Sequence, residues 1–545
     1  MTDLEIPFEK DRKGHYRFFE ILPGALSWSL LLLPVVLSLI NVTVAVFFIL
    51  LYLLIYFVRS LGYTARAIAG YRTMKQFQKL DWNGLAADIQ AGRALPARVD
   101  RPRWHLNNLK LLTNRVSDIK PNDLIHIAMV ATVNESREVL EPTIQAILDN
   151  DYDCRQQVIL VIAYEGRAGQ AAEDRVNELI ALYKDKFLDA MAFCHPADLP
   201  GEIIGKGGNI TFAGRQCQKY LAAAGIDPTR VVVTTLDADN RPDKNYLPAL
   251  SYLYCVVPDP QKASYQPLAM YTNNIWDAPT LMRVIATGNN LFYIVGTQRP
   301  HLSRNFSAHA QPMQALIDMD FWSTRTVVED GHQFWRSYFH FDGDYRVYPF
   351  SVPIYQDAVL ADGYLQTIRA QFVQLRRWTY GASDVAYIAD KGFWHKNKAS
   401  KADVLAKLLR TLESHVSWAT GIVLVFGAGF IPPLLHPQNL AANELPLIIS
   451  RVQKIGLATA LISVYICLVT LPPRPARYRR HRSVFMTLQW VLAPFTSFAF
   501  GSLAAFNSQT RLIFKWYLSK FDVTEKAVIT ASGKTITTKA DPGRH

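Results

Sequence analysis

The sequence predicts an α/β domain with a mainly parallel sheet, inserted between transmembrane helices. Long uncharged apolar blocks lie near both ends of the chain, and the region between them alternates short apolar runs with helical stretches. About 20 apolar residues can cross a membrane, whereas strands that alternate with helices form parallel βαβ units. The membrane helices are therefore expected to flank one soluble unit.

The N-terminal apolar block covers residues 21–58 and contains no charged residue. Its length suits two short spans that turn near Asn41, since one span needs about 20 residues. A signal peptide is excluded because its apolar core has only about 7–15 residues.

Three apolar blocks follow in the C-terminal part, at 416–435, 455–471 and 484–506. The first two predict spans. Pro494 and Gly501 interrupt the third block. Irregular backbone at membrane depth must be buried by protein. The third block therefore predicts either a re-entrant or interfacial element or a fifth complete span.

Basic residues place the soluble unit in the cytoplasm. The first 20 residues and the segments 59–79 and 474–482 are rich in Lys and Arg, whereas 436–445 contains neither. Cytoplasmic loops carry the excess of Lys and Arg. The chain is therefore expected to be a multi-pass integral protein of a plasma or inner membrane, with residues 60–410 in the cytoplasm.

The net charge of +12 has the same explanation. The positive charges cluster at the ends of the apolar blocks, where they meet anionic membrane lipid. A nucleic-acid-binding protein needs a basic patch with interleaved aromatic residues away from a membrane. Nucleic acid is therefore not an expected partner.

Two further segments, 60–80 and 395–412, mix basic and apolar residues. This pattern predicts amphipathic helices in the membrane interface, or solvated helices that pack on the soluble domain. The expected division of the chain is 1–60 (N-terminal tail and two transmembrane helices), 61–120 (interfacial linker), 121–385 (soluble α/β domain), 386–412 (interfacial segment), 413–510 (C-terminal transmembrane region) and 511–545 (cytoplasmic tail).

Four runs rich in β-branched residues predict buried strands, with helical patterns at 136–148 and 170–187 between the first ones. Ligands of such sheets bind at the carboxyl ends of the strands. The polar residues that follow each strand are therefore the candidates for a site. The strands are expected at 125–133, 157–163, 230–236 and 268–272.

Asp237 and Asp239 follow the third of these strands. Two carboxylates this close repel each other unless a cation compensates, and Mg²⁺ takes one or two carboxylates together with substrate phosphates. The pair predicts a divalent metal site, with a solvated loop or a helix N-cap as the alternative.

The ends of the first two strands supply Asn134, Glu135 and Glu165. Each is a candidate for contact with a base or a ribose hydroxyl, and each could instead cap a helix or lie on the surface. Lys206 and Asn209 belong to a glycine-rich segment before a helix, where the backbone and the lysine can approach a phosphate. A flexible surface loop is the alternative there.

Glu329 and Asp330 follow a strand-like run at 324–328. A carboxylate at this place is a candidate general base for an acceptor hydroxyl, and an acidic helix start is the alternative. The neighbouring His332 is expected to be a surface or packing residue.

Gln374, Arg377 and Trp378 lie on a helical pattern that starts near Asp362. An arginine beside a tryptophan can bind a phosphate and stack on a sugar at the same time. The same residues also suit an amphipathic helix at the membrane interface.

In this order the motifs resemble the family 2 glycosyltransferases, and look most like the membrane-embedded branch that includes cellulose, hyaluronan and poly-N-acetylglucosamine synthases. Lys206 and Asn209 resemble that family's Lys-Ala-Gly-Asn signature, and Val328 replaces the Thr of its TED motif. The other matches are Asp237 and Asp239 to DxD, Asp330 to the base of TED, and Gln374, Arg377 and Trp378 to QxxRW, whose side chains steady the diphosphate and the acceptor.

The resemblance covers roughly residues 120–385 and extends to the tail. The tail matches the FxVTxK gating loop of bacterial cellulose synthase, which implies that it closes over the bound nucleotide and lies in the cytoplasm. A cytoplasmic tail favours a re-entrant or interfacial element at 484–506 over a fifth complete span. The matching residues are Phe521, Val523, Thr524 and Lys526.

The resemblance implies a GT-A-like domain that performs a single inverting displacement at the anomeric carbon and requires Mg²⁺ or Mn²⁺. Asp330 would deprotonate the acceptor hydroxyl, with Glu329 as the second catalytic carboxylate. Asp239 would hold the metal on the diphosphate of a nucleotide-sugar, with Asp237 near the metal or the ribose. Uridine diphosphate is the implied carrier, and a growing glycan the implied acceptor.

Two other functions are weighed against this one. A non-processive transferase acting on a lipid or polyprenyl-phosphate acceptor would differ in the length of its product. A membrane transporter or receptor would carry charged residues inside its spans, and the clear spans show almost none. With four or five spans, a channel for the product would need a partner subunit or a homo-oligomer.

Overall fold

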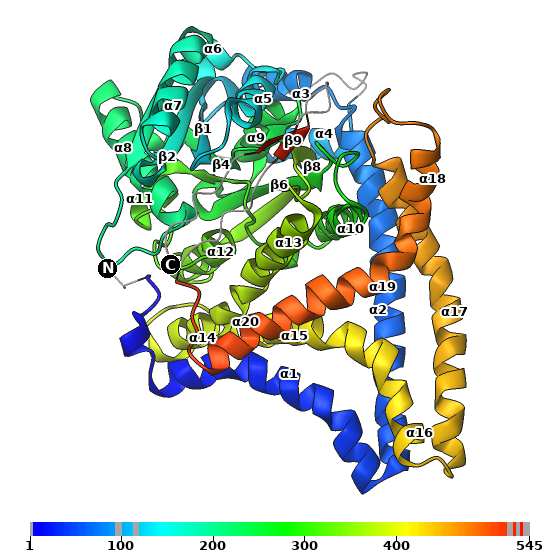
Figure 1. Cartoon of the computed structure of the whole chain (residues 1–545). Helices are drawn as coiled ribbons and strands as arrows, with labels where there is room; N and C mark the ends of the chain where they lie inside the picture. Colours follow the sequence, from blue (N-terminus) through cyan, green and yellow to red (C-terminus); the bar gives the residue numbers. More distant parts are fainter. Residues whose placement is uncertain (1–3, 93–100, 113–118, 520–526, 530–534, 538–545) are drawn as a thin grey trace.

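The computed structural model describes residues 4–92, 101–112, 119–519, 527–529 and 535–537. An α/β domain forms one side of the molecule, and long apolar helices from both ends of the chain lie against it (Figure 1). This arrangement confirms the expected fold class.

The α/β domain contains an eight-stranded sheet with the strand order β3-β2-β1-β4-β7-β6-β8-β5. Strands β3, β2, β1 and β4 are parallel, as are β6 and β8, whereas β7 runs antiparallel to β4 and β6 and β5 antiparallel to β8. The bounds are β1 (Ile125–Thr132), β2 (Val158–Glu165), β3 (Asp189–His195), β4 (Val231–Asp237), β5 (Arg241–Pro242), β6 (Ala263–Tyr271), β7 (His309–Pro312) and β8 (Arg346–Gln356).

The four expected strands are present as β1, β2, β4 and the second half of β6. Strands β3, β5, β7 and β8 were not expected. Pro349 and Pro353 interrupt the apolar pattern of β8, and its register with β6 shifts between them. β3 follows no continuous apolar run because it lies at the sheet edge, where most of its side chains are half-buried.

The expected strand at 324–328 is wrong. This run is an irregular loop. Val327 and Val328 are buried there against Tyr380 and Leu512, so their apolar character serves packing rather than strand pairing.

Helices cover both faces of the sheet. On β1, Ala128 and Val130 pack in the same cluster as Ile144, whereas Ile127 and Met129 pack on the opposite face. Each fully buried aliphatic side chain stabilises the fold by about 1.5–3 kcal/mol. The helices of the domain are α5 (Arg137–Leu148), α7 (Gln170–Tyr183), α8 (Lys206–Ala224), α9 (Tyr246–Val256), α10 (Thr280–Gly296), α11 (Met313–Asp318), α12 (Glu329–His340), α13 (Tyr364–Thr379) and α14 (Asp384–Ala389).

The N-terminal apolar block folds as two helices, α1 (Gly14–Ile40) and α2 (Val42–Phe77). Asn41 separates them and caps α2, since its Oδ1 accepts hydrogen bonds from the backbone N–H groups of Thr43 (3.0 Å) and Val44 (3.3 Å). The expected turn at Asn41 is confirmed.

The C-terminal part holds α15 (Lys401–Gly427), α16 (Ile431–Leu435), α17 (Leu440–Val469) and a broken helix from α18 (His481–Leu488) through α19 (Ala493–Thr496) to α20 (Leu503–Ile513). In the described part of the chain, five helical segments are long and apolar enough to cross a membrane. Helix α17 begins fifteen residues before the span expected at 455–471.

Helices also run across several expected domain boundaries. Residue 60 lies within α2, residue 385 within α14, residue 412 within α15 and residue 510 within α20. The soluble domain and the apolar helices are thus joined by continuous helices, and the expected division of the chain stays a prediction.

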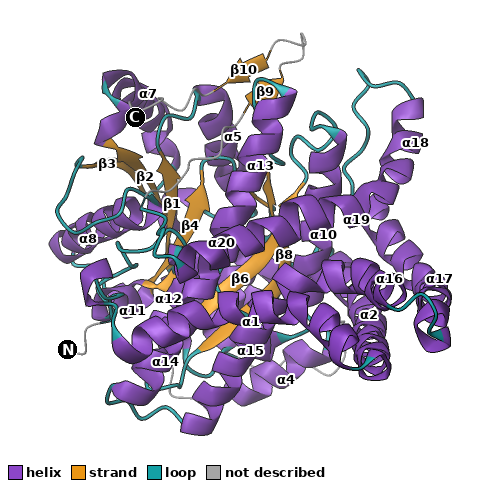
Figure 2. Cartoon of the chain, turned by 60° about the horizontal axis from the view of Figure 1, so that its bottom comes forward, coloured by secondary structure: helices purple, strands orange, loops and turns teal. Residues whose placement is uncertain are grey.

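The broken helix α18–α20 contacts the α/β domain along its whole length. At its start the Arg482 guanidinium donates to the Trp276 carbonyl (2.7 Å), and at its end Leu512 packs against Val327. Figure 2 shows α20 between α13 and α1, which it contacts. Because both ends meet the same domain, the geometry fits the interfacial interpretation of 484–506, whose placement in a membrane stays a prediction.

Candidate active site

A cleft opens at the carboxyl ends of β1, β2 and β4. It brings together nearly every residue that the sequence predicted for a site. The predicted residues that line it are Glu135, Glu165, Lys206, Asn209, Asp237, Asp239, Glu329, Asp330, Gln374, Arg377 and Trp378.

Among the described residues, one predicted site residue does not line the cleft. Asn134 lies just outside it and accepts a hydrogen bond from Arg175 (3.0 Å). The predicted gating residues Phe521, Val523, Thr524 and Lys526 lie outside the described residues.

Asp237 is the last residue of β4 and pairs with Lys206, the first residue of α8. The Lys206 ammonium donates to Asp237 Oδ1 (2.6 Å) and to the Ser307 carbonyl (3.1 Å), while the Ser307 hydroxyl donates to Asp237 Oδ2. The lysine side chain is only 8% exposed. A positive charge is thus fixed beside the carboxylate at the centre of the cleft.

Asp239 follows in a tight turn and is itself buried. Its Oδ2 accepts a hydrogen bond from the Asp357 N–H (3.0 Å). In the same turn, Asn240 Oδ1 accepts a hydrogen bond from the Asp237 N–H (3.0 Å). Asp357 follows β8 and lines the same cleft. The turn is therefore tied to the backbone that follows β8.

The donor set fits a hard divalent cation whose coordination substrate phosphates complete. Asp237, Asp239 and Asp357 offer the carboxylate oxygens that Mg²⁺ and Mn²⁺ prefer. Among the described residues no three His, Cys, Asp or Glu side chains are grouped closely enough to hold a metal by themselves. This matches Mg²⁺, which usually keeps one or two carboxylates and takes further oxygens from phosphates.

Asn209 and Glu135 have structural roles in the cleft wall. The Asn209 amide donates to the Ala163 carbonyl (2.9 Å) and to the Thr132 carbonyl (3.4 Å), which ties the ends of β2 and β1. Glu135 Oε2 accepts from the Val133 N–H (2.7 Å) and closes the turn after β1. The N-cap of α5 is Ser136 and no side chain caps that helix, so Glu135 is not the helix cap that the sequence offered as an alternative.

Glu165 is held by His195 at the end of the neighbouring strand β3. His195 lies between two carboxylates, 3.2 Å from Glu165 and 3.0 Å from Glu202. Burial alone lowers the pKa of His195, but the two carboxylates outweigh it and raise this pKa to about 9. Arg167 also lies beside Glu165 (3.3 Å). The negative charge of Glu165 at this end of the cleft is therefore balanced by Arg167 and His195.

Glu329 and Asp330 occupy the first turn of α12, as the helix-start alternative proposed. Burial raises the pKa of Glu329 to about 7, assisted by the negative charge of Asp330. Burial also raises the pKa of Asp330, which the Gly331 N–H and the charges of Lys206 and Arg377 oppose. One buried carboxylate pair therefore faces two cations across the cleft.

The motif on α13 forms the opposite wall. Gln374, Arg377 and Trp378 all line the cleft, and the Trp378 ring lies 6.1 Å from the Tyr271 ring at the end of β6. Helix α20 supports this turn because the Ser508 hydroxyl donates to the Arg376 carbonyl (2.6 Å). An aromatic pair beside an arginine suits a sugar next to a phosphate.

His332 does not line the cleft. It is fully buried, with Nδ1 2.8 Å from Asp384 Oδ1 and its ring 4.4 Å from that of Tyr387. The packing interpretation of this histidine is confirmed.

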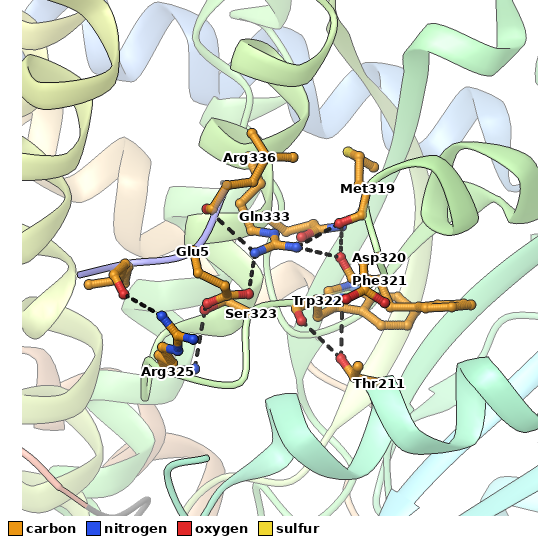
Figure 3. Close-up of polar contacts among 12 residues, drawn as sticks. Glu5, Thr211, Met319, Asp320, Phe321, Trp322, Ser323, Arg325, Gln333 and Arg336 are labelled. Carbon is orange, nitrogen blue, oxygen red and sulfur yellow. Dashed lines mark hydrogen bonds and ion pairs between the residues drawn. The ribbon is translucent and has the colours of Figure 1, made fainter. Parts of the chain in front are cut away.

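The N-terminal segment 4–8, here called the N-terminal anchor, docks on the loop that leads to Glu329 (Figure 3). Glu5 Oε2 accepts from the Ser323 hydroxyl (2.7 Å), and Glu5 Oε1 pairs with the buried Arg336 of α12. Arg336 also donates to the Met319 carbonyl (2.8 Å). Phe8 also contacts this loop, since the Arg325 guanidinium lies over the Phe8 ring, 3.9 Å from the ring centroid.

Helix α1 holds the chain that leads toward the tail motif. Glu20 accepts a hydrogen bond from the Tyr517 hydroxyl (2.9 Å), and Arg17 donates to the Leu512 carbonyl (2.6 Å). Arg12 lies over the Tyr517 ring at 4.6 Å. Tyr517 and Leu518 thus lie beside the loop that leads to the acidic pair.

Sequence reasoning missed the N-terminal anchor and several residues of the cleft. Arg167 stands two residues after Glu165, so the rule that found Glu165 could also have found it. Asp357 was not predicted because β8, the strand that precedes it, was not recognised from the sequence. Glu5 carries no local signal, since it acts through a loop more than 300 residues away.

Comparisons with known proteins give only weak similarities. No family model matches the sequence, and no curated protein matches it. Among solved structures, the mannosyltransferase PcManGT from Pyrobaculum calidifontis, in complex with GDP-Man and Mn²⁺, shares 15% identity over 79% of this chain and 98% of its own, with a TM-score of 0.36.

Two further structures are similar at a lower level. TarS 1–349 of S. aureus, in complex with UDP-GlcNAc, shares 11% identity over 77% of this chain and 98% of its own (TM-score 0.34). GalNAc-T7 with UDP, GalNAc and Mn²⁺ shares 10% over 54% of this chain and 58% of its own (TM-score 0.32). At these identities and TM-scores the similarity decides nothing about this chain, so its function is argued from its own cleft.

Proposed function

We propose that this protein is an inverting, metal-dependent glycosyltransferase with a GT-A-like domain. It transfers a sugar from a nucleotide-sugar, with uridine diphosphate as the carrier, to a growing polysaccharide at the membrane. One observation carries the proposal: four motifs far apart in the sequence line a single cleft at the carboxyl edge of parallel strands. These motifs follow the order seen in the family 2 glycosyltransferases that the sequence resembles.

The sheet side of the cleft suits the donor. The buried Lys206 offers a fixed positive charge for a diphosphate, and Asp239 with Asp237 would hold Mg²⁺ or Mn²⁺ there. When bound, such a metal offsets the charge that builds on a departing nucleoside diphosphate. Glu165 and Arg167, at the end of β2, lie where a base or a ribose can be contacted.

The helical side suits the acceptor and the proton transfer. The acceptor oxygen forms a bond to the anomeric carbon while the bond from that carbon to the diphosphate oxygen breaks, and Asp330 takes the hydroxyl proton. Burial and the negative charge of Asp330 raise the pKa of Glu329 to about 7. A proton on Glu329 would limit the negative charge beside Asp330. Arg377 and Trp378 would steady the diphosphate and the acceptor sugar.

The membrane side of the cleft suits a reaction at the cytoplasmic face. Helix α20 passes directly under α13, which carries Gln374 and Arg377. The tail motif with Thr524 and Lys526 follows the segment that α1 holds beside the acidic pair. By its resemblance to the gating loop, this motif would close over a bound nucleotide.

The same geometry favours one alternative, a non-processive transferase with a lipid or polyprenyl-phosphate acceptor. The broken helix is apolar on its outer side, where Phe498, just before α20, and Leu503, the first residue of α20, are exposed. This helix lies between the cleft and the expected membrane. A lipid-linked acceptor would reach the cleft along this surface. The length of the product separates the two functions.

The test uses the full-length protein in nanodiscs with a panel of nucleotide-sugars and Mg²⁺ or Mn²⁺. Release of nucleoside diphosphate and the size of a labelled product are followed for the wild type, Asp239→Asn and Asp330→Asn. The matched control is Asp185→Asn, an exposed aspartate outside the cleft. Metal-dependent release with a long product, lost in both cleft variants and kept in the control, is expected.

Each other result has a defined meaning. Addition of a single sugar supports the lipid-acceptor alternative. Release that persists in both cleft variants contradicts the assignment of Asp239 and Asp330. Absence of release with every donor contradicts the transferase proposal as a whole.

A further inference from the structure

Helix α17 is the least covered of the five candidate membrane spans. Only 11% of its most apolar window is buried, against 22–39% for the other four. One side packs on α2 and α15, where Leu445 and Ile449 are buried. The rest of the helix lies at the periphery of the helical bundle (Figures 1 and 2).

The uncovered side carries two basic residues, Arg451 and Lys454. They are three positions apart, so they lie on one face of the helix. Ile448 and Ile455, which are 36% and 64% exposed, flank them on the same face. We call these four residues the basic face of α17. In the described part of the chain, neither Arg451 nor Lys454 takes part in a hydrogen bond, an ion pair or a ring contact.

The length of α17 places both charges inside any membrane that it crosses. The helix has 30 residues and is about 45 Å long. Arg451 stands about 16 Å from its first residue and Lys454 about 22 Å from its last. A hydrocarbon core is about 30 Å thick, so every position in which α17 crosses the whole core includes both side chains. Charged residues inside spans are rare and normally have a partner.

We propose that the basic face of α17 binds a membrane-spanning helix of another protein, and that this helix carries at least one Asp or Glu at the depth of Arg451 and Lys454. The proposal rests on α17 crossing the membrane and does not depend on the transferase activity. Charge complementarity selects the occupant, because a carboxylate is the group that pairs with two adjacent cations.

A second copy of this chain does not fit the basic face. Two copies in one membrane share the same orientation, so their two-fold axis runs along the membrane normal and brings identical patches together. Arg451 would then face Arg451 and Lys454 would face Lys454. Glu444, the acidic residue of α17, lies seven positions before Arg451 and would meet its own copy instead.

Phosphate head groups of anionic lipid are the competing source of negative charge. Head groups attract cations at the ends of a span, as they would the cluster at 474–482. The basic face instead lies within the helix and is flanked by exposed isoleucines, which suits a packed helix better than a lipid head group.

The test measures binding of a synthetic single-span probe to the full-length protein in nanodiscs of phosphatidylcholine. The probe is a fluorescent leucine-rich helix with one central Asp, and matched probes carry Leu or Lys at that position. Energy transfer from the probe to a label on the protein reports binding. The Asp probe is expected to bind about tenfold more tightly than the Leu probe, and the Lys probe to bind most weakly.

Variants separate the basic face from general charge. Arg451→Leu with Lys454→Leu should remove the preference, and Arg451→Glu with Lys454→Glu should transfer it to the Lys probe. Arg474→Ala with Arg480→Ala, which removes two charges outside α17, should leave it intact. Equal binding of the Asp and Leu probes overturns the proposal. So does loss of the preference when phosphatidylglycerol replaces part of the neutral lipid, since the face would then hold head groups.

Discussion

The two sides of the cleft are fixed by different kinds of structure. On the sheet side, Asp237 and Glu165 end strands that are paired on both edges, and Asn209 joins two of those strand ends. On the helical side, Asp330 begins α12 and Arg377 lies on α13. Neither helix is held there by strand pairing.

The helical side depends on parts of the chain that are distant in sequence. The N-terminal anchor holds the loop before Glu329 through Ser323 and Arg336, and Ser508 of α20 holds the turn of α13. Changes on the sheet side should therefore alter binding of the ligand that the changed residue touches. Changes in the distant segments that support the helical side should instead alter turnover. Four experiments test this difference.

The largest effect is expected on the helical side itself. Asp330→Asn removes the proposed base, and loss of a general base typically lowers the rate by about 10²–10⁴-fold. Binding of the nucleotide-sugar, measured by titration in detergent, should change little because the sheet side is untouched. Equal loss of turnover and of donor binding would show that Asp330 is structural.

The second effect belongs to the sheet side. Lys206→Met removes the cation that pairs with Asp237 (2.6 Å) and leaves that carboxylate without its charge-assisted bond. Such bonds contribute about 1.5–3 kcal/mol, so donor affinity should fall about 10–100-fold. Lys219→Met is the matched control, since Lys219 is exposed on the same helix. Unchanged donor affinity in Lys206→Met would place the diphosphate elsewhere.

The third effect comes from the N-terminal anchor. Glu5→Gln weakens its ion pair with Arg336, which is only 2% exposed. We expect turnover to fall about tenfold while the KM for the donor stays the same, since charged hydrogen bonds contribute about 1.5–3 kcal/mol. Glu9→Gln, an exposed neighbour outside the anchor, should have no effect. A rise in KM with normal turnover would mean that the anchor acts on the sheet side instead.

The same division explains what could be predicted from the sequence. Strands β1, β2 and β4 appear as continuous apolar runs, and the polar residues that follow them mark the cleft, as Asp237 and Glu165 do. A strand that prolines interrupt gives no such signal, so Asp357 after β8 was missed.

The helical side was recognised through its motifs rather than through its geometry. The pattern at 324–328 indicated a strand, but those residues are buried as a loop by Tyr380 and Leu512, which lie far along the chain. The contact of Glu5 with Ser323 has no periodicity and no local pattern. Long-range contacts of single polar side chains leave no trace in the sequence, and the N-terminal anchor consists of such contacts.

The smallest expected effect is a change of stability with pH on the sheet side. Folding raises the pKa of His195 to about 9 because Glu165 and Glu202 flank it, whereas an unperturbed histidine has a pKa of about 6.5. The folded protein therefore binds this proton more tightly than the unfolded chain. The stabilisation is complete below about pH 6.5 and is lost as the pH rises through about 9.

His195→Gln should consequently unfold more easily than the wild type at pH 6, by roughly 1–3 kcal/mol, and should match it more closely at pH 10. Thermal unfolding in detergent across this range measures the difference, with the exposed His301→Gln as the control. Turnover relative to donor binding should stay constant, because His195 braces Glu165 through the strand ends and not through α12. A pH-independent difference would mean that His195 acts by packing alone. A shift in turnover would mean that the two sides of the cleft are coupled more tightly than their separate supports indicate.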